Sequence, residues 1–191
     1  MLKFILFLLS TSVIQQNTDF MDRFAKAAFD QQDQLVTYDG SYFVIPYPNG
    51  DVPDSIGVCT DVVIRAYRKV GYDLQKLIHE DMKKDFAAYN RRRKSDKIDA
   101  NIDHRRTPNM ETFFTRKGAK LMVTKNEEDY KPGDIVFWKV AAGHVGVVTP
   151  LKVPGTNRYY VVHNICCGNR VEDFLFTPEI TGHYRWNPEK K

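Results

Sequence analysis

Apolar residues in the first half of the chain recur every three or four positions, which is the spacing of one buried face of an α-helix. The clearest case begins at Cys59, where Val62, Val63 and Ala66 share a face. Gly71 ends this helix, because glycine readily takes the left-handed conformation found at helix C-termini. The predicted helices span residues 19–31, 59–70 and 74–89, with a short fourth helix opened by Thr107-Pro108.

The second half of the chain instead holds short apolar runs separated by turn residues such as Lys131-Pro132-Gly133-Asp134. Helices followed by strands are typical of the α+β class, and we expect N-terminal helices packed on a short antiparallel β-sheet. No linker or repeat interrupts residues 17–191, which predicts a single domain. The predicted strands span residues 119–123, 135–140, 145–149, 159–163 and 182–186.

The N-terminus resembles a signal peptide. Lys3 precedes an apolar run at residues 4–9, and polar residues begin at Gln15. The run is shorter than the roughly 20 apolar residues that span a bilayer. We therefore predict a signal peptide at residues 1–16, with export to the periplasm or the outside and no stable membrane insertion afterwards. An uncleaved anchor or an apolar first helix is the alternative.

Composition and charge exclude little about function and do not decide the fold class. A formal net charge of +4 with interspersed signs does not demand a nucleic-acid partner, and we expect none. The chain has three cysteines, so at least one stays unpaired within the chain, and their spacing matches no zinc motif. We predict no metal and no cofactor. Cys166 and Cys167 are adjacent, and neighbouring cysteines form an unfavourable ring. We expect both to be reduced in most molecules, or to form contacts unrelated to catalysis.

Cys59 is the first candidate for chemistry, because it follows a loop and opens a helix. A helix N-terminus lowers a thiol pKa, and its free N–H groups can hold an oxyanion. We therefore expect an activated thiolate. The alternative is a buried structural cysteine, since free cysteine also behaves as a small hydrophobe.

His144 is the candidate base. It stands at the start of a predicted strand, between Gly143 and Val145-Gly146-Val147, where glycines allow other groups to approach closely. A histidine on a strand facing a helix-borne cysteine is an arrangement of nucleophilic catalysis. The next strand ends in His163-Asn164, and either residue could orient the imidazole. We favour His163, which gives a Cys-His-His triad.

These motifs resemble those of the NlpC-type peptidases, which are papain-like bacterial cysteine peptidases that cut peptidoglycan stem peptides. The segments that carry the resemblance fall in the family's order: Gly57-Val58-Cys59-Thr60-Asp61, Pro132-Gly133-Asp134-Ile135-Val136, His144-Val145-Gly146-Val147 and Val162-His163. The resemblance implies a papain-like fold. It also implies an oxyanion role for Tyr47, which lies upstream of the cysteine; the alternative is a turn aromatic packed beside Pro46 and Pro48. The sequence departs from the family after Val58-Cys59, where Thr60-Asp61 replaces the usual Ser-Gly, and this puts the substrate in doubt.

Over nearly its whole length after residue 16, the chain also resembles a YijF-like family of exported bacterial proteins of unknown function. This family brings no established reaction. The motifs that carry the resemblance are Tyr47-Pro48-Asn49-Gly50-Asp51-Val52-Pro53, Asn101-Ile102-Asp103-His104-Arg105-Arg106, His163-Asn164 and Gly182-His183-Tyr184-Arg185.

Substrate binding is assigned to Asp61 and to His104-Arg105-Arg106. Arginine binds carboxylates with two parallel hydrogen bonds, and stem peptides are rich in carboxylates. We expect Arg105 or Arg106 to line a groove beside Cys59. The alternative is that both arginines tie down their own loop through Asp103, Asp99 or a backbone carbonyl.

Three functions follow from these residues. The first is a cysteine peptidase or amidase that hydrolyses an amide through a Cys59 acyl-enzyme, in a peptidoglycan peptide or another periplasmic amide. The second is a non-catalytic module on the same fold that binds cell wall or protein. The third and weakest is a metal site built from Cys59, His144, His163 and a cysteine of the 166–167 pair.

Overall fold

The computed structural model describes residues 20–32, 34–89 and 97–190. The signal peptide predicted at residues 1–16 lies outside these ranges. Within them, no helix is both long enough and apolar enough to cross a membrane.

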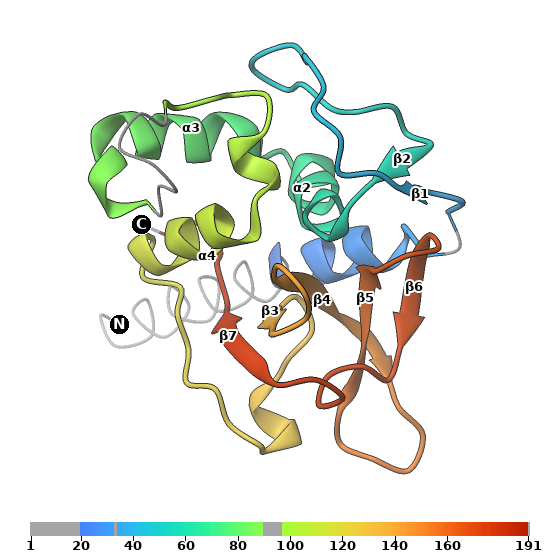
Figure 1. Ribbon diagram of the computed structural model, residues 1–191. Coiled ribbons are helices and arrows are strands. Elements are labelled where there is room, and N and C mark those ends of the chain that lie inside the picture. The colour runs from blue at the N-terminus through green and yellow to red at the C-terminus, as the bar shows by residue number, and fades with distance from the viewer. Residues whose placement is uncertain (1–19, 33, 90–96, 191) are drawn as a thin grey trace, which may run out of the picture.

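The described chain forms four α-helices and a five-stranded antiparallel sheet, which confirms the α+β class. The helices are residues 20–29, α2 (Cys59–Lys69), α3 (Leu74–Lys84) and α4 (Thr107–Arg116), with 3-10 turns η1 (Phe86–Ala88), η2 (Asp103–Arg105) and η3 (Glu127–Asp129). The large sheet has the order β6-β5-β4-β3-β7. Its strands are β3 (Ile135–Trp138), β4 (His144–Lys152), β5 (Tyr159–Asn164), β6 (Asn169–Glu172) and β7 (Ile180–Tyr184). A small parallel pair, β1 (Thr37–Tyr38) and β2 (Ile56–Gly57), lies beside α2 (Figure 1).

Helix α2 is the element that joins the helical layer to the sheet. Its apolar stripe packs on β4 and β5, and the helices gather on one side of the sheet (Figure 1). Gly71 follows the helix with a φ of +95°, a left-handed conformation that glycine adopts without cost. The core between the layers buries Cys59 together with Val62, Val145, Val147 and Val162.

The other face of the sheet carries a smaller apolar cluster. Side chains alternate along a strand, so Val148 and Val161 point away from α2 while their neighbours point towards it. Trp138 lies in this second cluster, and its indole N–H donates to the Leu175 carbonyl at 2.9 Å. Apolar side chains thus cover both faces of the sheet. Polar groups can meet at the ends of its strands.

The main differences from the sequence prediction lie in three segments. Residues 119–123 are not a strand, because only Lys120 bridges to β7, while Met122 and Val123 are exposed. The helix predicted over residues 74–89 ends at Lys84, where Asp85 starts a 3-10 turn by accepting from the Ala88 N–H. Strand β6 was not predicted. It is held by pairing with β5 rather than by an apolar pattern of its own.

Candidate active site

Cys59 is the first residue of α2, as predicted, and it is 3 % exposed. Burial raises the pKa of its thiol to about 11. Hydrogen bonds from the backbone N–H groups of Val145, Thr60 and Cys59 itself lower the pKa, but by less than burial raises it. Burial in this structure therefore opposes the activated thiolate that the sequence predicts. The helix terminus acts on a sulfur that is too deeply buried to ionise near neutral pH.

His144, His163 and Glu172 form a chain of hydrogen bonds at the edge of the core. His144 Nε2 lies 2.8 Å from His163 Nδ1, and His163 Nε2 lies 3.1 Å from Glu172 Oε2. Of the two residues proposed to orient the His144 ring, His163 is thus the one that forms a hydrogen bond with it. Neither side-chain polar atom of Asn164 has a hydrogen-bond partner in the described chain.

The direction of these hydrogen bonds follows from the carboxylate end. Ionised Glu172 can only accept, so His163 Nε2 carries the proton and His163 Nδ1 accepts. His144 must then donate from Nε2, which leaves the lone pair of its Nδ1 available. The chain therefore sets His144 in the tautomer that a general base needs.

Strand geometry explains how the two rings meet. Strands β4 and β5 pair with Val147 opposite Val162, which places Gly146 beside His163. A Cβ atom at Gly146 would lie 2.8 Å from Val161 Cγ1 and 3.0 Å from His163 Cβ. The close approach that the sequence suggested for the glycines near His144 is thus used at Gly146.

Aromatic side chains cover the imidazole pair. The Phe174 ring lies 4.3 Å from the His163 ring and 5.7 Å from the His144 ring, and Trp138 lies 5.8 Å from His144. Burial lowers the pKa of His144 to about 3, with a contribution from His163, and burial lowers the pKa of His163 to about 4. Both imidazoles are therefore neutral near neutral pH.

Cys59 and His144 are neighbours through the backbone of β4. The sulfur accepts from the N–H of Val145, the residue that follows His144. The His144 ring itself turns towards Trp138 and Phe174. Among the hydrogen bonds of the described residues, none joins the Cys59 sulfur to an imidazole.

The tyrosine that reaches Cys59 is Tyr38 rather than Tyr47. Burial raises the pKa of Tyr38, and so do the charge of the Cys59 thiolate and a hydrogen bond to Cys59. Pairing of β1 with β2 sets Tyr38 opposite Gly57, two residues before the cysteine. Tyr47 instead packs against His79 of α3, with 4.7 Å between the ring centroids.

An open cavity of about 450 Å³ lies over Cys59. Its described lining comes from the β1 segment, the start of α2, the η2 segment, the start of α4 and the loop before β4. The side chains that matter for chemistry are Tyr38, Tyr42, Cys59, Arg105, Arg106 and Asn109. At least one of Arg105 and Arg106 was predicted to line a groove beside the cysteine, and both are at the cavity.

Arg105 and Asp61 form a buried ion pair beneath the cavity, with side chains that are 2 % and 3 % exposed. Arg105 Nε and Nη2 donate to the two Asp61 oxygens at 3.0 and 2.9 Å. Asp61 also accepts from the Val58 N–H at 2.7 Å, and the Thr60 hydroxyl donates to the Arg105 carbonyl. These contacts fix the start of α2, so Asp61 holds Cys59 in place and does not line the cavity.

His104 also departs from its predicted role in substrate binding. It is 3 % exposed and is not part of the described cavity lining. Burial lowers the pKa of His104 to about 4, with a further contribution from Arg105, and its Nδ1 has no hydrogen-bond partner in the described chain. Arg106, in contrast, has a side chain that is 50 % exposed.

Cys166 and Cys167 form a disulfide between adjacent residues, which corrects the prediction that both are reduced. They lie in the short turn between β5 and β6, where the backbone of Cys167 bridges to Thr37. Among the described residues, no group of three or more His, Cys, Asp or Glu side chains is arranged to hold a metal ion.

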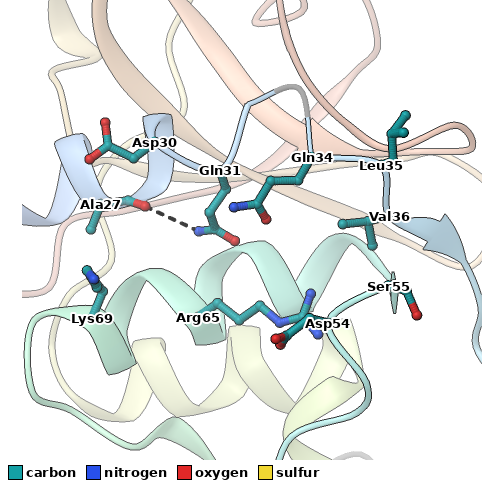
Figure 2. Close-up of a pocket in the computed structure, with 10 residues that line it drawn as sticks. All are labelled: Ala27, Asp30, Gln31, Gln34, Leu35, Val36, Asp54, Ser55, Arg65 and Lys69. Atoms are coloured by element: carbon teal, nitrogen blue, oxygen red, sulfur yellow. Dashed lines mark hydrogen bonds between the residues drawn. The ribbon is translucent and has the colours of Figure 1, made fainter.

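A second, larger cavity of about 700 Å³ lies away from these groups (Figure 2). Its described lining combines the end of the first helix, the segment that leads to β1, and the side chains of Arg65 and Lys69 on α2. No cysteine or histidine is part of that lining. The chemistry of the described chain therefore gathers at the smaller cavity over Cys59.

Comparisons with known proteins agree on a family but not on an activity. Residues 25–186 match the family DUF1287, described as a domain of unknown function. The chain is also 47 % identical over 176 residues to the uncharacterized protein YijF of Escherichia coli strain K12, covering 91 % of this chain and 84 % of that protein. No solved structure matches.

Proposed function

The chain belongs to the DUF1287 family of unknown function, and we propose that it is a cysteine peptidase or amidase that hydrolyses an amide through a Cys59 acyl-enzyme. The observation that carries the proposal is the hydrogen-bond chain from His144 through His163 to Glu172. This chain ends beside the backbone N–H that holds the Cys59 sulfur. It gives a strand histidine the neutral form and the tautomer of a general base, next to a thiol under an open cavity.

In the first half of the reaction, the Cys59 sulfur attacks the substrate carbonyl carbon while its proton passes to His144 Nδ1. The free thiol has a pKa of about 11, so proton transfer accompanies attack and does not precede it. Entry of substrate must bring the sulfur and the His144 ring into contact. The imidazolium that forms is stabilised through His163 by the Glu172 carboxylate.

The oxyanion that forms on the carbonyl oxygen is held by the Cys59 N–H and the Tyr38 hydroxyl. As the carbon–nitrogen bond breaks, His144 returns the proton to the leaving amine, and Cys59 is left as a thioester. Water then gives a proton to His144 and attacks the thioester carbon. A carboxylic acid leaves, and the thiol recovers its proton.

We further propose that the fold is papain-like, of the NlpC type, and that the protein acts after export. This proposal rests on the order of the Cys59, His144 and His163 motifs and on the apolar N-terminal segment. A peptide amide in the peptidoglycan stem is the substrate that this resemblance favours. Another periplasmic amide is the alternative.

One observation favours the non-catalytic binding module. A buried neutral thiol with no hydrogen bond to an imidazole in the described structure is what a retained structural cysteine would show. On this alternative, the cavity over Cys59 binds a cell-wall or protein ligand and releases it unchanged. The two functions differ in whether Cys59 is needed for product formation.

The test is incubation of the protein with purified muropeptides, with products identified by mass spectrometry. We expect cleavage by the wild type and none by Cys59→Ala or His144→Ala. Glu172→Gln should turn over at least about tenfold more slowly, because an amide at this position no longer fixes the tautomer of His163. Bound but uncleaved muropeptide would support the binding module and overturn the hydrolase.

A histidine outside the site provides the control. His79→Gln changes a ring on α3 that packs against Tyr47, and it should cleave at the wild-type rate. Equal loss of activity in His79→Gln and His144→Ala would mean that any loss of a histidine harms the protein. Circular dichroism of each variant checks that the fold is intact.

A further inference from the structure

Two adjacent arginines at the Cys59 cavity stand in opposite environments. The guanidinium of Arg105 uses four of its five N–H groups within the described chain: besides Asp61, it donates to the Asp39 and Ser41 carbonyls at 3.1 and 3.3 Å. Its side chain is 2 % exposed. Arg105 therefore has at most one N–H to spare for a ligand, and its charge is neutralised by Asp61.

Arg106 has the reverse environment. Within the described chain, its guanidinium donates no hydrogen bond, and its one ion pair is with Asp103 at 3.6 Å. The Asp103 carboxylate is itself engaged, because it accepts from the Asp99 N–H at 2.7 Å. A half-exposed guanidinium at 3.6 Å from one acid keeps its hydrogen-bonding fork available to a ligand.

The charge of the cavity points to the kind of ligand. Among the described residues that line it, two are arginines and none is Asp or Glu. Asp61 neutralises Arg105 through short hydrogen bonds, so the more loosely paired charge at the cavity is that of Arg106, which lies 3.6 Å from Asp103. Asn109 and the Tyr38 and Tyr42 hydroxyls add neutral polar groups to the same lining.

We propose that Arg106 is the specificity-determining residue of this site and that it binds a carboxylate on the substrate close to the amide that is cleaved. The proposal deepens the hydrolase function. Cleavage of the substrate rests on that function, whereas binding of the carboxylate by Arg106 does not. The substrate class is an amide whose acyl or amine part carries a free carboxylate, and Arg105 serves only to position the start of α2.

The experiment compares two fluorogenic peptides, acetyl-Ala-Glu and acetyl-Ala-Gln amides of aminocoumarin, which differ by one carboxylate. The affinity of each peptide for the Cys59→Ala variant is measured by calorimetry. The kcat/KM of each peptide is measured by fluorescence with protein that retains Cys59. We expect the Glu peptide to bind about 10- to 100-fold more tightly, which is the usual worth of a charged hydrogen-bonded pair. Arg106→Gln should remove this preference, and Arg106→Lys should keep part of it.

Lys139→Gln provides the matched control, because it removes the same charge from an exposed site outside the cavity lining. It should leave the preference unchanged. Equal binding of the two peptides to Cys59→Ala, or a preference that survives Arg106→Gln, would overturn the role of Arg106. Turnover that persists in Cys59→Ala would overturn the hydrolase instead, so the two failures are distinguishable.

Discussion

At the scale of the residue, Cys59 is subject to opposing influences on its ionisation. Three backbone N–H groups point at the sulfur and favour the thiolate, while burial favours the thiol. The effect of burial is larger, because the thiolate loses more solvation free energy on leaving water than the three N–H groups give back. In an opened, hydrated cavity, Cys59 would keep its hydrogen bonds from the N–H groups, and burial would raise its pKa much less. Its reactivity should therefore depend on access.

The alkylation rate of Cys59 measures this balance. Iodoacetamide should modify it slowly at pH 7, and the rate should still be rising above pH 9, because the pKa of the thiol is raised to about 11. The disulfide between Cys166 and Cys167 leaves Cys59 as the free thiol of the native protein. Peptide mapping by mass spectrometry follows the reaction.

A pH profile centred below the roughly 8.5 of an ordinary thiol would contradict this prediction and restore the activated thiolate. Cys59→Ser identifies any signal that comes from the disulfide pair. Urea-unfolded protein serves as the reference in which Cys59 titrates normally.

Residue identity was predictable where chain order alone places the group. Cys59 at the start of a helix, and His144 and His163 on successive strands, follow from local pattern and spacing. Tyr38 and Glu172 do not. Tyr38 reaches Cys59 only because β1 pairs with β2, and Glu172 reaches His163 only because β6 pairs with β5. No spacing rule in the sequence encodes either pairing.

At the scale of the element, the start of α2 is held by a charge pair rather than by a side-chain cap. Val58 stands at the N-cap and has no side-chain acceptor, so Asp61 takes the Val58 N–H instead. Arg105 then neutralises Asp61 and connects the helix to the β1 segment through two carbonyls. One buried pair thus sets the position of Cys59 relative to the cavity.

Breaking this pair should be costly. Asp61→Asn or Arg105→Ala leaves a buried charge without its partner, and we expect a loss of about 3–5 kcal/mol in the free energy of unfolding. Urea denaturation followed by circular dichroism measures it. Lys139→Ala, which breaks the exposed pair with Glu179, should cost less than about 1 kcal/mol.

An Arg105→Ala variant with wild-type stability would show that the pair contributes nothing to the fold. Arg105 would then be available for another role at the cavity. The comparison with Lys139→Ala separates a specific buried contact from the general effect of removing one positive charge.

Element types followed from hydrophobic spacing where an apolar face was long. The helix of Cys59 and strands β3, β4 and β5 are examples. The spacing failed at residues 119–123, where an apolar run lies along the surface, and at β6, where Asn169, Arg170 and Glu172 give no apolar alternation. A strand stabilised by its neighbour carries little pattern of its own, so tertiary pairing decides it.

At the scale of the whole molecule, buried neutral histidines link the candidate site to global stability. His104, His144 and His163 are each 3 % exposed or less. Burial lowers their pKa values to about 4, 3 and 4, respectively. Two of these rings belong to the hydrogen-bond chain, and His104 lies beside Arg105 in η2. The arrangement that keeps the base neutral therefore also makes the folded state sensitive to acid.

The sign follows from the proton count of each state. In the unfolded chain a histidine titrates near pH 6.5. Below that pH the unfolded state therefore binds protons, while the buried histidines of the folded state stay unprotonated. The contribution of these histidines to the free energy of unfolding is fully present above about pH 6.5, and it falls as the pH drops towards 4. Each histidine contributes up to about 1.4 kcal/mol per pH unit. Asp103 and Glu111 offset part of this loss, because burial raises their carboxyl pKa values.

His104→Gln isolates one of the three contributions without touching the hydrogen-bond chain. The free energy of unfolding in urea, measured between pH 5 and pH 7, should fall with acid in the wild type. In His104→Gln it should fall less steeply, by up to about 1.4 kcal/mol per pH unit. His79→Gln is the matched control at a less buried ring and should change the slope less. Parallel slopes in wild type and His104→Gln would mean that His104 is protonated in the folded protein, and that burial does not hold the histidines around this site neutral.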